Sequence, residues 1–341
     1  MISSSAEPFS NPIVSVIVAV YNSADYLLPC LESLRQQTLR QIQVICVDDA
    51  STDESWNILN HFSKEDSRFE VIHLEVNGGQ AHARNVALKQ VRGRYVAFLD
   101  SDDFLSADAL QASVNVFEHY VKTDCVLFSL VKFGEKDGKC REENYPLPQF
   151  DVMSGREAFK RSLNWEVHGV YVARKALYDQ VPFDDSCRTY SDDNTTRLHY
   201  YLSREVRPCK GRYYYRQHPS SVTHQISVRR FDYLKACESM KRQLMALNVG
   251  QDILNFYENQ RWLVLIDTCL FYYNHHDQLS EKDKRYGRQE LKRIWKNIER
   301  FRLTPRLRHK FGYSPMPAWW FFRTEEWCYF TLRKIIWKGK K

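Results

Sequence analysis

Three aspartates, Asp100, Asp102 and Asp103, stand close together at the end of a short apolar run. A hard divalent cation such as magnesium or manganese prefers oxygen ligands, and it usually takes one or two carboxylates together with substrate phosphates. Two aspartates at positions i and i+2 that leave a strand through a turn can converge on one such ion and on a diphosphate. The alternative is a solvated acidic loop in which Asp103 caps a helix. The motif alone does not separate these two interpretations.

The run before these aspartates is the last of four apolar segments of strand length, and stretches with helical spacing separate the segments. The first segment, residues 13–20, is β-branched and apolar on both faces, as a buried parallel strand is. Strands that alternate with helices indicate an α/β protein with a mostly parallel sheet and right-handed crossovers. The other three segments are residues 43–47, 69–74 and 95–99.

Polar clusters follow all four segments. Ligands of parallel sheets bind beyond the carboxyl ends of the strands, so we expect the four clusters to lie close together. This convergence favours a ligand site over an acidic surface loop. The clusters are Tyr21-Asn22, Asp48-Asp49, Asn77-Gly78-Gly79 and Asp100 to Asp103.

The second half of the chain changes in organisation. Residues 124–133 are typical of a further strand, whereas residues 136–148, rich in charge, glycine and proline, are typical of a loop. From about residue 226 apolar residues recur at helical spacing. We therefore predict a first domain over residues 1–225, a helical region over 226–310 and a basic aromatic tail over 311–341. The helical stripes are Trp262, Leu265, Cys269 and Tyr272, and then Leu291, Ile294, Ile298 and Phe301.

Composition excludes several classes of protein. The 341 residues are 43% hydrophobic and 27% charged, which is the balance of a globular protein. The net charge of +7 is uneven, since residues 301–341 hold ten Lys or Arg against two Glu and leave residues 1–300 nearly neutral. A neutral body argues against nucleic acid as a partner. The nine cysteines lack zinc-site or disulfide spacing, and no signal peptide is evident, so we expect a cytoplasmic protein.

Four blocks within residues 14–103 resemble the inverting family-two glycosyltransferases of bacterial cell-surface polysaccharide synthesis, which have the GT-A fold. The resemblance is strong over about the first 110 residues and weaker to about residue 225. Ala19 stands where the family usually has Pro, and Ala50 where it usually has Gly. The implied fold is α/β, a Rossmann-like and mostly parallel sheet flanked by helices, followed by a C-terminal helical region. The blocks are residues 15–22, 47–53 with Asp48-Asp49-Ala50-Ser51-Thr52-Asp53, 77–85, and 95–103 with Asp100-Ser101-Asp102-Asp103.

The resemblance implies that residues 1–225 bind a nucleotide-sugar and carry out catalysis. Ala19, Tyr21 and Asp49 would line the nucleobase pocket, where Asp49 accepts a hydrogen bond from a uracil-type N–H. Gly79, which lacks a Cβ, would let the backbone come close to the nucleotide. For Tyr21 the alternative is packing in the core.

The same resemblance implies roles around the aspartates. Arg84 would lie near the base or the phosphates, and Asp100 and Ser101 would contact the nucleotide. Asp100 and Asp102 would bind a manganese or magnesium ion. For Arg84 the alternative is an ordinary charge on a helix surface.

Inverting transfer is a single displacement, in which the acceptor hydroxyl needs a carboxylate within reach to take its proton. The family supplies this base from an acidic pair at a helix start, and the matching residues are Asp192, which replaces the usual Glu, and Asp193. The resemblance implies that Asp193 is the base and that Asp192 positions it or the acceptor. A helix cap by Ser191 or Asp192 is the alternative, and both interpretations can hold together.

A further stretch of the family folds over the diphosphate, and residues 213–224 match it. Arg216 would clamp phosphate, since its planar guanidinium donates to pairs of oxygens. His218 would complete the metal shell or contact the diphosphate, although a lone histidine is more often structural.

The tail 311–341 mixes aromatic and basic residues, which suits the headgroup region of an anionic membrane. Acceptors of the family are often lipid-linked, which would give such a tail a purpose. The alternative is a helix packed on the second domain. Five charges within residues 319–337 exclude a bilayer span. We expect a location on the inner face of the cell membrane.

These expectations combine into one function. The chain would move a sugar from a nucleoside-diphosphate sugar, with UDP favoured, to a hydroxyl of a glycan or lipid-linked acceptor. The alternative is a non-catalytic sugar-nucleotide-binding or scaffold protein of the same fold. A phosphohydrolase is disfavoured because its Asp-x-Asp follows the first strand, and a sugar-nucleotide pyrophosphorylase because Tyr21-Asn22-Ser23 is no glycine-rich loop. The sugar, the linkage and the oligomeric state are left open.

Overall fold

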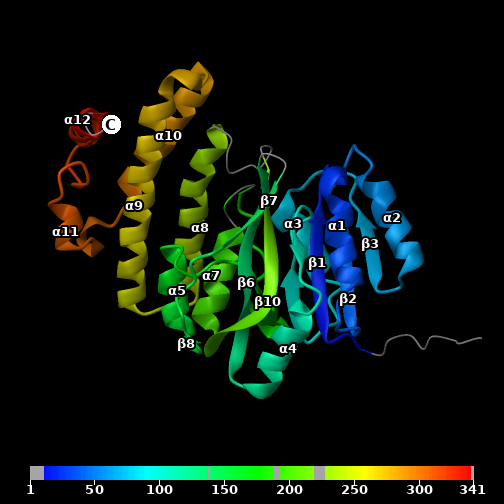
Figure 1. The fold of residues 1–341 in the computed structure, drawn as a ribbon. Helices are drawn as coiled ribbons and strands as arrows, with labels where there is room; N and C mark the ends of the chain where they lie inside the picture. The colour runs from blue at the N-terminus through cyan, green and yellow to red at the C-terminus, as the bar shows by residue number, and fades with distance from the viewer. Residues whose placement is uncertain (1–10, 137–138, 188–189, 191, 219–226, 339–341) are drawn as a thin grey trace, which may run out of the picture. The chain divides into compact units, whose positions relative to one another are not determined.

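The computed structural model describes residues 11–136, 139–187, 190, 192–218 and 227–338, and the chain forms two compact units (Figure 1). One unit comprises Met1–Arg188 and Thr195–Ser221, and the other comprises Thr189–Asn194 and Val222–Lys341. The predicted division at residues 225 and 310 stays a prediction.

A ten-stranded sheet of the described residues forms the centre of the first unit. Its strands run in the order β3-β2-β1-β4-β9-β6-β10-β5, with β7 paired to β6 and β8 paired to β10. From β3 to β4 all neighbours are parallel, whereas β9 is antiparallel to β4 and β6. The strands are β1 Val14–Val20, β2 Ile42–Asp48, β3 Phe69–His73, β4 Tyr95–Phe98, β5 Phe104–Leu105, β6 Thr123–Lys136, β7 Lys139–Asn144, β8 Met153–Ser154, β9 Tyr171–Arg174 and β10 Glu205–Gln217.

The register of the parallel strands collects the predicted polar loops at one edge. Every residue of β1 is buried, as its apolar sequence predicts for a strand covered on both faces. Val20 of β1 lies opposite Asp48 of β2, and Asp48 lies opposite His73 of β3. Because these strands end together, the segments that follow them begin side by side.

Helices pack against this sheet through apolar faces. Leu31 of α1 and Val114 of α4 join Val16 and Val18 of β1 in one buried cluster, and α3 packs on β1 and β2. The predicted α/β architecture with its C-terminal helical region is confirmed. The helices of this part are α1 Ala24–Arg35, α2 Ser55–Glu65, α3 Gln80–Leu88, α4 Ala109–His119, α5 Gly155–Leu163, α6 Lys175–Gln180 and α7 Asp192–Leu202.

The prediction of a loop over residues 136–148 is wrong in part. Residues 139–144 form β7, which pairs with β6 in antiparallel register, with Asn144 opposite Val131. Charged residues are poor strand formers on average, but backbone pairing with a long neighbouring strand outweighs that weak preference.

The second unit is helical around a core of its own. Trp262, Leu265, Cys269 and Tyr272 are buried there as their spacing predicts. Phe301 is 70% exposed, because α10 ends at Asn297 and a short 3₁₀ turn breaks the stripe. The elements are η2 Val228–Phe231, α8 Asp232–Ala246, α9 Gln251–His275, η3 His276–Gln278, α10 Glu281–Asn297, η4 Arg300–Arg302, α11 Pro305–Arg308 and α12 Trp319–Lys338.

None of the helices in the described part of the chain combines the length and the apolar character that crossing a membrane requires. All nine cysteines are free thiols.

Candidate nucleotide and metal site

Hydrogen bonds join the loops that follow β1 and β2. The Asn22 N–H donates to Ser51 Oγ at 3.0 Å, and Asn22 Oδ1 accepts from the Thr52 N–H at 2.8 Å. Asn22 and Ala50 adopt left-handed backbone conformations, with φ of 48° and 61°. Glycine and asparagine reach that region at least cost, which explains why a glycine is usual at the position of Ala50.

Asp49 anchors the loop that follows β3. Its side chain is buried, and its two oxygens accept from the N–H groups of Gly78 and Gly79, each at 2.8 Å. Gly79 then precedes α3 with φ of 92° and ψ of 163°, a conformation that is essentially restricted to glycine. The structure therefore gives Asp49 a positioning role, and its contact with a nucleobase stays a prediction.

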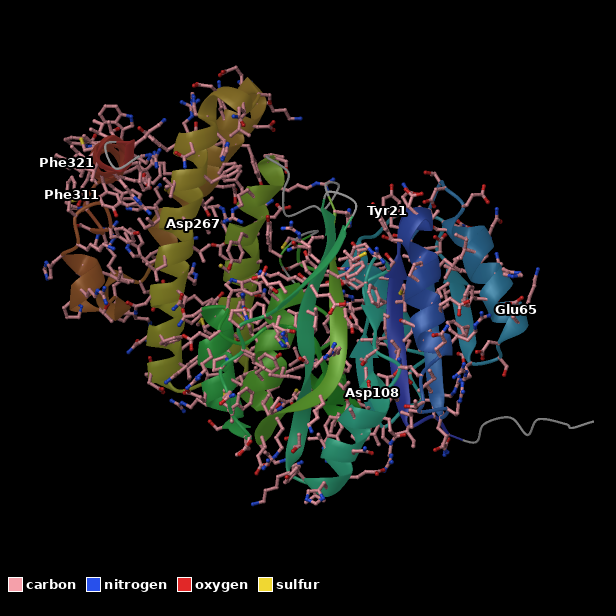
Figure 2. The ribbon with its side chains drawn as sticks, in the orientation of Figure 1. Tyr21, Glu65, Asp108, Asp267, Phe311 and Phe321 are labelled. Carbon is pink, nitrogen blue, oxygen red and sulfur yellow. The ribbon has the colours of Figure 1, made fainter. Side chains whose placement is uncertain are left out.

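Ala19 and Tyr21 precede α1 in the chain, and Ser101 contacts the turn that leads into it. Tyr21 is 50% exposed at the end of β1, so the alternative of core packing is wrong (Figure 2). Ala19 is 9% exposed within β1. Ser101 Oγ lies 2.7 Å from Ser23 Oγ, which ties the aspartate loop to the loop after β1.

Arg84 of α3 reaches the aspartate loop from inside the protein. It is 1% exposed and donates to Asp100 Oδ1 at 2.5 Å, while Gln80 Nε2 donates to the same oxygen at 2.9 Å. Its guanidinium also lies over the ring of Phe98, 4.5 Å from the centroid. Burial excludes the alternative of an ordinary surface charge. Asp100, with its side chain 32% exposed, is thus held in place by two donors.

Asp102 and His218 face each other beside this pair. Asp102 Oδ2 lies 2.9 Å from His218 Nε2. The His218 ring stacks on Tyr26 of α1 with centroids 4.6 Å apart, which fixes its orientation. A carboxylate oxygen and an imidazole nitrogen that converge in this way are a ligand pair for a divalent cation.

Asp103 is part of the scaffold instead. It is buried, its Oδ2 accepts from the Tyr213 hydroxyl at 2.7 Å, and its Oδ1 accepts from the Arg216 N–H at 2.7 Å. Burial, and then the charges of Asp100 and Asp102, raise the pKa of the Asp103 carboxyl well above its usual value. The alternative of a helix cap is wrong, because both oxygens bond to β10.

Arg216 lies between the aspartate loop and a surface groove. Its Nε donates to the Asp102 carbonyl oxygen at 2.8 Å. Its guanidinium lies over the rings of Phe133, Tyr26 and Phe104, at 5.3, 5.5 and 5.5 Å from their centroids. The predicted phosphate clamp stays a prediction. The groove has a volume of about 310 Å³ and is lined by Pro29, Glu32, Ser33, Gln36, Phe104, Leu105, Ala107, Phe133 and Arg216.

Three residues that hold this site were not predicted from the sequence, namely Tyr26, Gln80 and Tyr213. Tyr213 had a usable signal, because inward and outward positions alternate along a strand and it lies in an aromatic run. Tyr26 and Gln80 had none, since their partners lie far away in the sequence.

Comparison with known proteins gives the family. Residues 15–184 match the family model described as Glycosyl transferase family 2. The chain belongs to glycosyl transferase family 2. The recognition of family two made from the four sequence blocks is therefore confirmed, whereas inversion stays a prediction.

Two curated relatives illustrate how much of each protein is shared. The glycosyltransferase GlyG of Streptococcus pneumoniae is 29% identical over 204 residues, which cover 57% of this chain and 67% of GlyG. WfaP of Escherichia coli, a UDP-Glc:α-D-GlcNAc-diphosphoundecaprenol β-1,3-glucosyltransferase, is 40% identical over 126 residues, which cover 37% of this chain and 48% of WfaP. The matched part thus spans about half of WfaP.

The solved structure of TarS residues 1–349 from S. aureus in complex with UDP-GlcNAc is similar over nearly the whole chain. The TM-score is 0.71 at 20% identity, and the match covers 96% of this chain and 92% of that one. At this identity the likeness shows the fold, which is the GT-A fold with a helical region after it.

A family-two fold raises the question whether the residues present fit a divalent metal. The described residues contain no group of three or more His, Cys, Asp or Glu side chains arranged to hold one. The predicted set of Asp100, Asp102 and His218 is therefore not assembled, because Asp100 points to Arg84 and Gln80. Asp102 and His218 alone do fit an ion that completes its shell with diphosphate oxygens and water.

Asp192 and Asp193 begin α7, at the helix start where the family has its acidic pair. They belong to the stretch 189–194 of the second unit, in which Asn194 Nδ2 donates to the Ala236 carbonyl oxygen at 2.8 Å. Ser191, the alternative cap, lies outside the described residues. The roles of Asp192 and Asp193 in proton transfer stay predictions.

Proposed function

We propose that this family-two glycosyltransferase moves a sugar from a UDP-sugar to an acceptor hydroxyl with inversion at the anomeric carbon, assisted by a divalent metal. The observation that carries the proposal is the pair of Asp102 and His218 next to Asp100, which Arg84 holds from inside. Two protein ligands beside a third carboxylate suit an ion that shares its shell with a diphosphate.

The nucleotide half of the proposal rests on the loops after the parallel strands. We propose that Ala19, Tyr21 and Asp49 line the base pocket and that Gly79 lets the backbone approach the nucleotide. The exposed ring of Tyr21 supports this, because it is available to stack on a base. That TarS was solved with UDP-GlcNAc in the same fold also supports a UDP-sugar donor.

Manganese or magnesium would be held by Asp102 and His218, and when bound it neutralises charge that develops on the diphosphate as it leaves. Arg84 fixes the Asp100 carboxylate from inside the protein, and we propose that Asp100 and Ser101 share contacts with the nucleotide. Arg216 stabilises this loop, because its Nε donates to the Asp102 carbonyl oxygen and so helps to hold the Asp102 carboxylate in place.

The transfer step needs a base for the acceptor. We propose that the acceptor oxygen attacks the anomeric carbon while the bond from that carbon to the diphosphate oxygen breaks. The hydroxyl proton passes to the Asp193 carboxylate, and Asp192 positions Asp193 or the acceptor. Such positioned general bases contribute roughly 10²- to 10⁴-fold in rate.

The acceptor class is proposed from the relatives. The printed name of WfaP includes a sugar carried on diphosphoundecaprenol, which is a lipid-linked acceptor. We propose a glycan or lipid-linked acceptor for this chain as well, in cell-surface polysaccharide synthesis on the cytoplasmic side of the membrane. The rival function is sugar-nucleotide binding without transfer.

Calorimetric titration with UDP, with manganese and then with EDTA, tests the donor site. We expect manganese to raise the affinity for UDP at least tenfold, and Asp102→Asn to abolish most of that gain. Asp108→Asn, the same chemical change at an exposed aspartate of the same unit, serves as the control (Figure 2). Affinity for UDP that is indifferent to both manganese and Asp102→Asn contradicts the proposal.

Release of UDP from UDP-sugars separates the enzyme from a binding protein. We expect slow hydrolysis of at least one UDP-sugar with manganese and faster turnover with a lipid extract as acceptor. Tight binding of UDP without turnover of any UDP-sugar under either condition favours the non-catalytic alternative.

A further inference from the structure

One helix of the second unit presents an unusual number of large apolar side chains to solvent. α12 buries Phe322 and Phe330, which are 1% and 3% exposed, against the core of that unit. Trp319 and Tyr329 pack partly against the same core, whereas six further apolar residues are exposed, and Figure 2 labels Phe321 among them. The outward residues, called the α12 face here, are Trp320 at 61% exposure, Phe321 at 46%, Trp327 at 56%, Leu332 at 51%, Ile335 at 63% and Ile336 at 59%.

These six side chains form one continuous surface. At about 100° per residue, their positions fall within about half of the circumference of the helix. Single exposed apolar residues are normal on a soluble protein, but a contiguous group of this kind marks an interaction site. The α12 face therefore has the character of an interaction surface.

The helix α10 of the same unit carries a charged counterpart. Five cations recur on its exposed side, at spacings of three and four residues that place them along one stripe. Within the described part of the chain no ion pair joins them to a carboxylate, whereas Glu281 bonds to Lys284 and Glu290 to Arg293. The residues of this stripe, called the α10 stripe here, are Lys282, Arg285, Arg288, Lys292 and Lys296.

A ring contact connects the two helices. Trp295 of α10 packs edge-on against Trp319 of α12 with centroids 5.5 Å apart, and it also contacts Phe322 at 6.2 Å. Lys296 follows Trp295 directly, and Trp320 follows Trp319 directly. The C-terminal part of α10 and the start of α12 thus meet at one pair of packed indoles.

We infer that the α12 face and the α10 stripe together bind the surface of an anionic lipid bilayer. Tryptophan and phenylalanine enter the boundary between headgroups and acyl chains, and lysine and arginine attract anionic headgroups. The helix lies in the interface and does not span, since no described helix can cross a bilayer. This inference rests on the proposed function only for the membrane-bound acceptor that it explains.

Charge favours an anionic lipid surface, and not a second copy of the chain, as the partner of this surface. A symmetric dimer places the same patch against itself, so the cations of one protomer face those of its partner. Residues 301–341 carry ten basic against two acidic residues, and α10 adds its stripe. Such a contact repels itself, whereas anionic headgroups neutralise the same charges.

Sedimentation of the full chain with lipid vesicles tests the inference. The probes, both at low salt, are vesicles of phosphatidylcholine alone and vesicles in which about one lipid in three is phosphatidylglycerol. We expect binding to the anionic vesicles only, weakened by added salt. The triple variant Trp320→Ser/Trp327→Ser/Ile335→Ser should lose at least tenfold in partition coefficient. Arg285→Gln/Lys292→Gln/Lys296→Gln should lose about 100-fold, at about fivefold per cation.

Matched controls come from the first unit. Val76→Ser/Val121→Ser/Trp165→Ser removes three exposed apolar side chains, and Lys64→Gln/Lys89→Gln/Lys122→Gln removes three exposed cations. Both controls should bind vesicles as the unchanged chain does. Equal losses in the controls, or no binding of the unchanged chain to anionic vesicles, would overturn the inference.

Sedimentation equilibrium without lipid tests the remaining candidate partner of the α12 face, which is a second copy of the chain. A dimer that the Trp320, Trp327 and Ile335 variant converts to a monomer, together with absent vesicle binding, overturns the inference in favour of a second copy. UDP titration of the same variants separates this test from that of the donor site. Lost vesicle binding with intact UDP affinity leaves the proposed function standing.

Discussion

The aspartates of the candidate site differ in what surrounds each carboxylate. Asp49 and Asp103 are buried, and each accepts hydrogen bonds on both oxygens from the protein itself. Asp100 and Asp102 are each 32% exposed at the side chain, although Asp100 also bonds to Arg84 and Gln80, and Asp102 to His218. Sequence motifs treat these four residues alike, although the first pair builds the loops and the second pair is the one proposed to meet the ligand.

Asp103→Asn separates these roles. An amide at this position has one acceptor oxygen for two donors, so a bond to β10 is lost or weakened and the free energy of unfolding should fall by about 1–3 kcal/mol. Asp102→Asn leaves a part-exposed site and should change stability by less than about 0.5 kcal/mol. Urea unfolding of both variants measures the difference. Equal stabilities of the two variants would show that Asp103 does not anchor β10.

Gly79→Ala tests the backbone of the loop after β3. A Cβ there meets nothing within 4 Å, so any loss must come from the φ of 92° and not from a clash. Residues held in this region cost about 1–3 kcal/mol unless they are glycine. We expect that loss in urea unfolding and a weaker affinity for UDP. Gly169→Ala, whose Cβ meets Thr196 at an ordinary 3.4 Å, is the control that should retain both.

At the scale of elements, α7 is held to the sheet through a buried histidine. His199 lies between the Tyr171 hydroxyl, 2.7 Å from Nδ1, and the Val181 carbonyl oxygen, 2.8 Å from Nε2. The carbonyl can only accept, so Nε2 carries a proton and donates in this hydrogen bond. Burial lowers the pKa of His199, and likewise that of His168, to about 4.

This lowered pKa predicts an acid-labile first unit. Between pH 6.5 and about 4 the unfolded chain binds protons at these histidines that the folded chain does not, so stability rises with pH in this window and is lost as pH falls. Each histidine therefore accounts for a loss of about 3 kcal/mol in the free energy of unfolding between neutral pH and pH values below about 4. His199→Gln can keep one donor and one acceptor without titrating, and it should therefore flatten about half of the slope. Thermal melts from pH 7.5 to 4.5 measure it, and an unchanged slope in the variant would refute the assignment.

The elements also show what a sequence can reveal. The convergence of Asp49, Gly79 and Asp102 was predictable, because parallel strands of known order end at one edge. The bonds from Arg84 to Asp100 and from Tyr213 to Asp103 were not, because they depend on rotamers and on pairing between distant strands. The strand β7 escaped prediction for a similar reason, since charged residues became a strand only through the neighbouring β6.

For the whole molecule, the two units differ in their chemistry. The first unit holds the groups proposed to bind the donor, and the second holds the α12 face, the α10 stripe and the stretch 189–194 with Asp193. Contact with lipid and capture of the nucleotide should therefore respond to separate substitutions. Added salt should weaken vesicle binding far more than it changes the KM for the UDP-sugar, because buried and part-buried charges are screened less.

Asp193→Asn is the decisive test of the proposed transfer. If Asp193 takes the acceptor proton, the substitution should lower kcat by about 10²- to 10⁴-fold. It should leave the manganese-dependent affinity for UDP within about twofold, because the proposed nucleotide ligands are unchanged. Asp192→Asn, the same change one residue earlier, should reduce kcat less and act more on the KM for the acceptor. Loss of the general base also removes the corresponding limb from the pH profile of kcat. A damaged helix start would instead change stability and leave that limb in place. Near-normal transfer by Asp193→Asn on the true acceptor would assign the proton to another group and leave the acidic pair with a role at the helix start only.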